Sequence, residues 1–347
     1  MNRKGIRLTP GLVFPALYFV ALAIVMVIRG VPTWRGEGHP GLFEIGGFTV
    51  RLYGVMLMTG AFAGALVGQA EARRRGLNEE HVWNILFWGL IFGVIFARLW
   101  FVVGRWSYYT ANPLEIIGIE RGRFVGLRGL TLHGALIGAI VSLLFYTRRR
   151  RIDFFTWLDV GAPGFVMGQS VGRWGNFFNQ EAYGWRTSLP WGLRIGAEFR
   201  IDAVHRVNGV RYILPEYSKL ALGSPECGQG LACYTNLSLY PPETRFHPTF
   251  LYESLWNFLL CLFLLWFARR FGERLVRGEV FWVYGILYSV GRFANEFLRV
   301  DSEYLGPYPA AQVVSVVILV ISLGFLVGRR WIWKRAPGAL PPSVAGP

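Results

Sequence analysis

Eight apolar stretches of about 18–22 residues constrain the fold of this 347-residue chain more than any other feature. A stretch of that length crosses the roughly 30 Å hydrocarbon core of a bilayer as a helix, because each residue advances the helix by about 1.5 Å. The stretches cover residues 11–28, 49–69, 82–103, 130–147, 154–172, 249–267, 279–298 and 309–327. We therefore predict an all-α polytopic membrane protein, a bundle of about seven to eight transmembrane helices.

The overall composition supports this class. The chain is 53% hydrophobic and only 16% charged, whereas about a quarter of the residues of a soluble domain are charged. The first apolar stretch follows the basic MNRKGIR and so resembles a signal sequence, but RGVPTW stands after it in place of a small-x-small cleavage site. We expect residues 1–30 to be a retained, additional N-terminal transmembrane helix.

The net charge of +15 is explained by membrane topology rather than by nucleic acid. With eight helices, alternate connections fall on opposite sides of the membrane, and one side collects 18 Lys and Arg in short segments such as RRRRID and ARRFGERLVRG. Short basic connections mark the cytoplasmic face. We predict a multi-pass membrane protein with both termini in the cytoplasm and no nucleic-acid partner.

The sequence divides into a membrane bundle and small additions. We assign residues 31–184 and 247–330 to the main membrane bundle, and 331–347 to a cytoplasmic tail. Residues 185–246, rich in Pro, Gly and charge, are predicted to form a small extracytoplasmic cap, with LPWGLRI and VRYIL as strands.

The three cysteines have different surroundings. Cys261 lies inside an apolar stretch and is expected to be a buried small residue. Cys227 and Cys233 both lie in the predicted cap, where an oxidising compartment permits a disulfide. A Cys227–Cys233 disulfide and two free thiols both remain open at this point, because spacing alone does not show pairing.

Glycines recur at four-residue spacing in two of the apolar stretches. They are Gly60, Gly64 and Gly68 in the second stretch, and Gly134 and Gly138 in the fourth. Small residues at this spacing let membrane helices approach closely, so we predict a packing role for them.

Charged side chains inside the apolar stretches are the main functional candidates, since a charge at mid-bilayer costs about 2.5–3.5 kcal/mol. In the predicted topology they gather in the outer half of the membrane. They are Arg51, Arg98, His133, Arg173, Arg292, Glu296 and Arg299. At helix ends, an arginine such as Arg51, Arg98 or Arg299 can also simply extend to the headgroups. Arg292 is 13 residues into its stretch, too deep for its side chain to reach the headgroups. For this residue a functional role is therefore the favoured interpretation.

The stretch YSVGRFANEFLR, residues 288–299, places its polar groups on one side of a helix. At 100° per residue they fall within an arc of about 100°. They are Tyr288, Arg292, Asn295, Glu296 and Arg299. We predict a polar stripe that faces the interior of the bundle. The alternative is that Arg292 and Glu296, one turn apart, only neutralise each other.

An outward-facing group of arginines suits an anionic headgroup. Guanidinium groups bind phosphate bidentately and stabilise charge that develops on a phosphate leaving group. The chain contains no G-x-S-x-G, H-E-x-x-H or Walker motif, so the nucleophile is expected to be water or a substrate group. His133 could instead be an interhelical hydrogen bonder, and Asn176 and Asn179 simple turn residues.

The segment GRWGNFFNQEAYG, residues 172–184, closely resembles the G-R-x-G-N-F-x-N-x-E-x-x-G signature of the prolipoprotein diacylglyceryl transferases. LTLHGALIG, HPTFLYE and YSVGRFANEFLR resemble three further family segments in the same order, and RLYG and ARLWFV match weaker ones. The resemblance covers most of residues 45–328.

The resemblance implies an enzyme that moves the diacylglyceryl group of phosphatidylglycerol onto the lipobox cysteine of a prolipoprotein signal peptide. A thioether forms and glycerol 1-phosphate leaves. With the charge pattern, it assigns catalytic roles to His133, Arg173, Tyr288 and Arg292. It assigns substrate binding to Tyr53, Arg98, Asn176, Glu181, Gly184, Glu296 and Arg299. His133 is one candidate base for the thiol, and which group takes the proton stays open. No metal or organic cofactor is implied, and we expect a monomer in contact with membrane lipid.

The sequence departs from the family pattern at several places. Ala135, Phe250 and Arg51 replace a family glycine, glutamine and histidine, and both the N-terminal helix and the 185–246 insertion are additional. Two alternatives therefore remain: a divergent paralogue that uses phosphatidylglycerol with another acceptor, and a non-enzymatic anionic-lipid-binding or transport protein.

Overall fold

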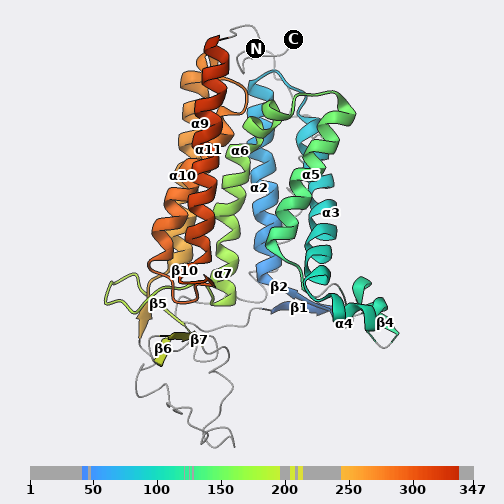
Figure 1. Ribbon diagram of the computed structural model, residues 1–347, viewed down its shortest axis with the longest axis vertical. Helices are drawn as coiled ribbons and strands as arrows, with labels where there is room; N and C mark the ends of the chain where they lie inside the picture. Colours follow the sequence, from blue (N-terminus) through green and yellow to red (C-terminus); the bar gives the residue numbers. More distant parts are fainter. Residues whose placement is uncertain are drawn as a thin grey trace, which may run out of the picture.

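The computed structural model describes residues 41–45, 48–120, 122–124, 126, 129–195, 204–207, 210–213 and 244–335. Seven long helices of this part stand side by side as a bundle (Figure 1). They are α2 (Leu52–Arg74), α3 (Glu80–Val103), α5 (Leu132–Arg150), α6 (Phe154–Gly172), α9 (Thr249–Phe271), α10 (Glu279–Glu296) and α11 (Ala310–Arg335). The mainly helical architecture confirms the predicted fold class.

Seven of the eight apolar stretches correspond to these helices. The eighth, 11–28, lies outside the described residues, as do Cys227 and Cys233. Within the described residues, four helices are long and apolar enough to cross a membrane: α2, α3, α9 and α11. The number of seven to eight transmembrane helices therefore stays a prediction, while the membrane character is clear.

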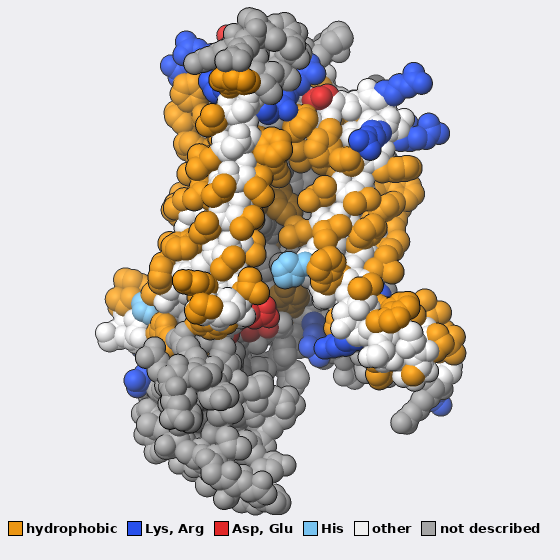
Figure 2. Space-filling model, viewed as in Figure 1, with side chains coloured by type: hydrophobic (Ala, Val, Ile, Leu, Met, Phe, Trp, Pro, Cys, Tyr) orange, Lys and Arg blue, Asp and Glu red, His pale blue; other side chains and the backbone are white. Residues whose placement is uncertain are grey.

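The outer surface of the bundle is apolar. Large hydrophobic side chains such as Phe87, Phe145, Leu259 and Val320 are each about half or more exposed, and Figure 2 shows hydrophobic side chains covering the sides of the helices. Soluble monomers rarely expose contiguous apolar surface of this extent. Lipid contact along the helix sides accounts for it.

Close backbone approach organises the bundle into two helix pairs. In α2, a Cβ added to Gly60 would lie 2.5 Å from the Gly168 carbonyl oxygen of α6, and one added to Gly64 would overlap the Gly164 carbonyl oxygen. In α5, Gly134 and Gly138 lie in the same way against the Phe96 and Phe92 carbonyls of α3. The predicted packing role is confirmed for these four glycines, because no larger residue fits at these crossings. At Gly68 a Cβ would meet only ordinary contacts, the nearest at 3.4 Å, so close approach does not require glycine there.

Helix α6 lies against α2, α9 and α10. Its buried Asp159 accepts hydrogen bonds from the backbone N–H groups of Gly278 (2.7 Å) and Phe281 (3.0 Å). These are donors at the start of α10 that have no partner within their own helix. Asp159 therefore caps α10 from a neighbouring helix, as a carboxylate at the positive end of a helix dipole.

One end of the bundle carries basic side chains paired with buried carboxylates. Glu71 accepts from Arg74 Nη2 (2.6 Å) and Arg75 Nε (2.7 Å) at the end of α2. At the start of α10, Glu279 accepts two hydrogen bonds from Arg330 on α11, at 2.7 and 2.9 Å. The connections α2–α3, α5–α6 and α9–α10 all lie at this end (Figure 1); the last contains the 3-10 turn η4 (Gly272–Arg274).

Short helices and strand pairs occupy the other end (Figure 1). The short helices are α4 (Trp106–Ala111), η1 (Pro113–Ile117) and α7 (Trp174–Asn179). The antiparallel pairs are β1 (Gly41–Ile45) with β2 (Phe48–Arg51), β3 (Ile119–Glu120) with β4 (Arg123–Phe124), β5 (Leu193–Arg194) with β8 (Arg245–Phe246), β6 (Val204–Val207) with β7 (Val210–Ile213), and β9 (Tyr304–Leu305) with β10 (Tyr308–Pro309). LPWGLRI and VRYIL contain β5 and β7, so both predicted strands are confirmed.

Most helix boundaries differ by a few residues from the hydropathy prediction, and two of these differences have a clear structural context. Helix α2 begins at Leu52 rather than at 49, because residues 48–51 pair with β1 as a strand. Helix α11 continues to Arg335, eight residues beyond the predicted 327, through the basic segment that contains Arg330. Cys261 is fully buried in α9, as predicted.

Candidate active site

Four charged side chains from three helices meet at the strand-bearing end of the bundle. Oε2 of Glu253 on α9 pairs with Nε of Arg173, at the C-terminal end of α6. Its Oε1 lies 3.1 Å from Nη1 of Arg292 on α10. The same Nη1 lies 2.6 Å from Oε2 of Glu296, one helical turn further on. We call Arg173, Glu253, Arg292 and Glu296 the arginine–carboxylate cluster.

The two carboxylates of this cluster are deeper than the two arginines. The side chains of Glu253 and Glu296 are 7% and 2% exposed, against 23% for Arg173 and 14% for Arg292. The part of the cluster that remains accessible is therefore its cationic part.

A pair of serines fastens α6 to α9 beside this cluster. Ser170 Oγ donates to the Ser254 carbonyl (2.8 Å), and Ser254 Oγ donates to the Ser170 carbonyl (2.9 Å). Ser170 precedes Arg173 by three residues and Ser254 follows Glu253 directly. These reciprocal bonds, both buried, fix the two backbones from which Arg173 and Glu253 extend.

An aromatic core supports the segment after Arg173. Trp174 and Phe177 of α7 contact Phe250 of α9, with ring centroids 5.8 and 5.6 Å apart. Phe250 is only 1% exposed. The phenylalanine that replaces the family glutamine at this position is thus part of the core that holds α7 on α9.

The polar residues of the GRWGNFFNQEAYG segment, residues 172–184, form a second group next to this core. Asn176 and Asn179 both donate through Nδ2 to Oε1 of Glu181, at 2.9 and 3.2 Å. The turn-residue interpretation of the two asparagines is thus incomplete, because they orient a carboxylate. Gly184 donates its N–H to the His247 carbonyl (2.7 Å), and a Cβ there would lie 2.5 Å from the Leu298 carbonyl oxygen. Only glycine allows this approach.

Tyr53, at the start of α2, joins the same neighbourhood. A Cβ on Gly175 would lie 2.8 Å from Cδ2 of its ring, so the missing side chain of that glycine makes room for the tyrosine. Tyr53 lies within electrostatic range of Glu181 and Arg173. The structure therefore brings Tyr53, Arg173 and the Asn176–Glu181 group together, as the sequence predicted.

The stripe on α10 is also confirmed. Arg292 is mostly buried, Asn295 and Glu296 are buried, and the opposite face is lipid-exposed, with Phe297 64% and Val290 46% exposed. Tyr288 lies in the stripe one turn before Arg292 and packs on Tyr284, with ring centroids 5.6 Å apart. Because Arg292 contacts two carboxylates, neutralisation by Glu296 alone does not describe its environment.

Arg299 lies just beyond α10 and extends the charged region. It donates to both carboxylate oxygens of Asp301, at 2.8 and 2.9 Å, and lies 4.0 Å from Glu296. Burial opposes its charge, but the hydrogen bonds to Asp301 outweigh that and raise the pKa of Arg299 above its usual range. Arg299 is thus held in an ion pair with Asp301, and the interpretation that it only extends to the lipid headgroups is incomplete.

His133 lies on a different helix pair from the cluster. It is exposed, in the first turn of α5, which Thr131 caps by accepting from the Gly134 N–H (3.3 Å). Thr131 also donates to the Ala97 carbonyl of α3 (3.2 Å). Exposure leaves the imidazole accessible to a ligand, and its role as a base stays a prediction.

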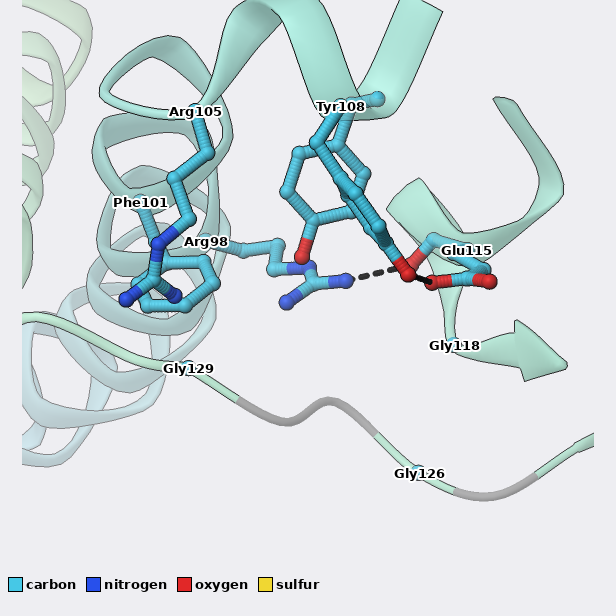
Figure 3. A pocket seen from close by; sticks show the side chains of 9 residues that line it. Arg98, Phe101, Arg105, Tyr108, Glu115, Gly118, Gly126 and Gly129 are labelled. Carbon is cyan, nitrogen blue, oxygen red and sulfur yellow. Dashed lines mark hydrogen bonds between the residues drawn. The ribbon is translucent and has the colours of Figure 1, made fainter. Parts of the chain in front are cut away.

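Arg98 is buried in its own cavity, of about 330 Å³, rather than in the arginine–carboxylate cluster (Figure 3). Its guanidinium donates to the backbone carbonyls of Glu115 and Ile116 in η1 and lies 5.1 Å from the Tyr109 ring centroid. Arg105, from the same side of the cavity, stacks on Phe101. Arg98 thus holds the η1 segment on α3, and substrate contact by Arg98 stays a prediction.

Sequence reasoning missed Glu253 and Asp301. Glu253 is the last residue of HPTFLYE, a segment noted only for its family resemblance, although a carboxylate inside an apolar stretch is itself a signal of function. Asp301 follows the α10 stripe directly. Among the described residues, no group of three or more His, Cys, Asp or Glu side chains is arranged to hold a metal ion.

Fold and site together define a polytopic helical membrane protein with a partly accessible arginine pair held by buried carboxylates. The family model for prolipoprotein diacylglyceryl transferase matches residues 40–328. The chain therefore belongs to the prolipoprotein diacylglyceryl transferase family.

Similar proteins named phosphatidylglycerol--prolipoprotein diacylglyceryl transferase come from several bacteria. That of Chloroflexus aggregans is 40% identical over 85% of this chain and 88% of its own length. Those of Lysinibacillus sphaericus and Synechococcus elongatus are 38% and 37% identical, over 84% and 88% of this chain and 92% and 93% of their own lengths. The match therefore covers nearly the whole of each relative.

Proposed function

We propose that this protein transfers the diacylglyceryl group of phosphatidylglycerol to the lipobox cysteine thiol of prolipoproteins and releases glycerol 1-phosphate. The observation that carries the proposal is the position of Arg173 and Arg292. They come from two separate family segments, share Glu253, and keep part of their guanidinium surface accessible. Two guanidinium groups at one point suit a phosphate diester.

The chemistry follows from that placement. The cysteine sulfur forms a bond to the glyceryl carbon, the bond between this carbon and the phosphate oxygen breaks, and its electron pair stays on the phosphate. Arg173 and Arg292 stabilise the charge that develops there, as donors fixed in advance. A thiol has a pKa near 8.5, so its proton must pass to a base for the sulfur to react readily. We assign this step to His133, whose imidazole is accessible.

The remaining residues act in binding. Tyr53, Asn176 and Glu181 form the wall next to Arg173, and Gly184 lies against Leu298 beside Arg299. Tyr288, Glu296 and Arg299 form the α10 side of the site, and Arg98 holds the segment that closes the end of α3.

The proposed activity can be tested with the protein purified in detergent, in which it should run as a monomer. Incubation with phosphatidylglycerol and a lipobox peptide should release glycerol phosphate in proportion to thioether formed on the peptide. A peptide with Ser in place of the lipobox Cys should give neither product. Equal release with both peptides would reject the thiol acceptor and favour the paralogue with another acceptor, and no release at all would reject the transferase.

We further propose that the arginine–carboxylate cluster faces the outer leaflet of the bacterial inner membrane and that both termini are cytoplasmic. The basic connections at the opposite end of the bundle support this orientation through the positive-inside rule. A cytoplasmic reporter fused after residue 335 should be active, and the same reporter inserted after residue 210 should be inactive. The reverse pattern would overturn the orientation.

A further inference from the structure

Glu253 is the point at which the two arginines of the proposed site are joined. Each of its carboxylate oxygens serves one arginine, Oε2 for Arg173 and Oε1 for Arg292. The two arginines come from helices separated by more than a hundred residues of sequence. Within the described residues, no other carboxylate forms an ion pair with both of them. Their separation is therefore set by the width of one carboxylate.

The same ion pairs use only part of each guanidinium. Arg173 is bound through Nε, and Arg292 through Nη1. A guanidinium has five N–H donors in a planar fork, so each arginine keeps donors on its other nitrogens. The arginine side chains are also the more exposed, at 23% and 14% against 7% and 2% for the two carboxylates. The carboxylates hold the arginines from behind, and the remaining donors are on the accessible part of the cluster.

Glu253 itself is fixed in place. Ser254 beside it is bound reciprocally to Ser170 of α6, and Thr249, one turn earlier in α9, donates to the Ala182 carbonyl. Both side chains are buried. Because the α9 backbone is held on both sides of Glu253, its carboxylate has a fixed place and can fix the places of the two arginines that it binds.

We propose that Glu253 is a positioning residue that sets the separation and orientation of Arg173 and Arg292 for a phosphodiester headgroup, without contacting the reacting atoms. This inference rests on the proposed function and deepens it. Binding sites that depend on two guanidinium groups lose productive geometry when their spacing changes by about 1 Å, which can reduce turnover about 10²-fold.

The test is Glu253→Gln, which keeps the size of the side chain but removes its charge and replaces one acceptor by a donor. The amide can accept from only one arginine, so the other is released. We expect kcat/KM for phosphatidylglycerol to fall about 10²-fold with a raised KM for this lipid. The KM for the lipobox peptide should not change.

The matched control is Glu71→Gln at the opposite end of the bundle. Glu71 is also buried and also joins two arginines, Arg74 and Arg75. Its replacement should change thermal stability in the same way as Glu253→Gln but leave both KM values unchanged. An unchanged KM for phosphatidylglycerol in Glu253→Gln, or the same kinetic change in both variants, would overturn the positioning role.

A second readout does not depend on turnover. Phosphatidylglycerol should raise the unfolding temperature of the wild-type protein and of Glu71→Gln more than phosphatidylcholine does, and this difference should be lost in Glu253→Gln. If the wild type shows this difference, Glu253→Gln loses it and the wild type transfers nothing, the proposed function fails and the positioning role stands. If Glu253→Gln keeps the full difference, the positioning role fails whatever the activity.

Discussion

Replacing Arg292 with glutamine should reduce kcat/KM for diacylglyceryl transfer by about 10²–10³-fold, the loss typical of removing one fixed donor from a developing negative charge. Arg292 contacts both Glu253 and Glu296, so the substitution removes the cationic partner on the α10 side of the site. Arg292→Lys should recover part of the activity, because lysine keeps the charge but not the planar fork that binds phosphate bidentately. Release of glycerol phosphate from phosphatidylglycerol in the peptide assay measures both variants.

Loss of a buried ion pair can also destabilise the protein, and Arg330→Gln controls for this. Arg330 binds Glu279, a buried carboxylate at the other end of the same helix, through two hydrogen bonds. Arg330→Gln should lower the unfolding temperature but leave kcat/KM near the wild-type value. Full turnover in a folded Arg292→Gln variant would show that Arg292 does not bind the phosphate.

Gly64→Ala should have the largest effect on stability. The added Cβ would overlap the Gly164 carbonyl oxygen, which belongs to the backbone of α6 and has no rotamer with which to move away. Overpacking of this kind costs about 1–3 kcal/mol. The expected result is a lower unfolding temperature and less folded protein after detergent extraction.

Gly161→Ala is the matched comparison on α6. A Cβ at Gly161 meets no atom within 4 Å, and the residue is exposed. The substitution removes the same glycine flexibility without a clash, so it should leave stability unchanged or raise it. If both variants were equally stable, close approach of α2 and α6 would not be what these glycines provide.

The fold was predictable to the extent that hydropathy determines it. Seven helices lie where the apolar stretches predicted them, because apolar length and backbone hydrogen bonding leave few alternatives in a membrane. The sequence did not predict which helices pack against each other. The glycine spacing predicted that α2 and α5 pack closely, but only the structure shows that Gly64 lies on Gly164 and Gly134 on Phe96. A spacing within one helix carries no information about which helix lies opposite.

The site was predictable where a charge lies in an apolar stretch. Arg292 and Glu296 were found this way, and the structure places them together with Arg173. Glu253 was missed because its significance depends on two arginines that are distant in sequence. Arg98 was also found as a charge in an apolar stretch, but it lies outside the cluster. Its guanidinium donates to backbone carbonyls of η1, and nothing in the sequence indicated these partners.

Helix α6 is linked to α10 near both of its ends, directly through Asp159 and through Glu253 of α9, and this has a consequence for the chain that follows α7. Asp159 caps the first turn of α10, and fourteen residues later Arg173 shares Glu253 with Arg292. The distance between these two points of contact is therefore fixed by the rigid helices α6 and α10 and does not depend on a loop. The part of the chain between β5 and β8 is closed at its base, because Leu193 pairs with Phe246 and both pack in the core with Phe177 and Phe250. A change in its length or sequence therefore leaves the spacing of the two arginines, and with it the grip on the lipid, unchanged.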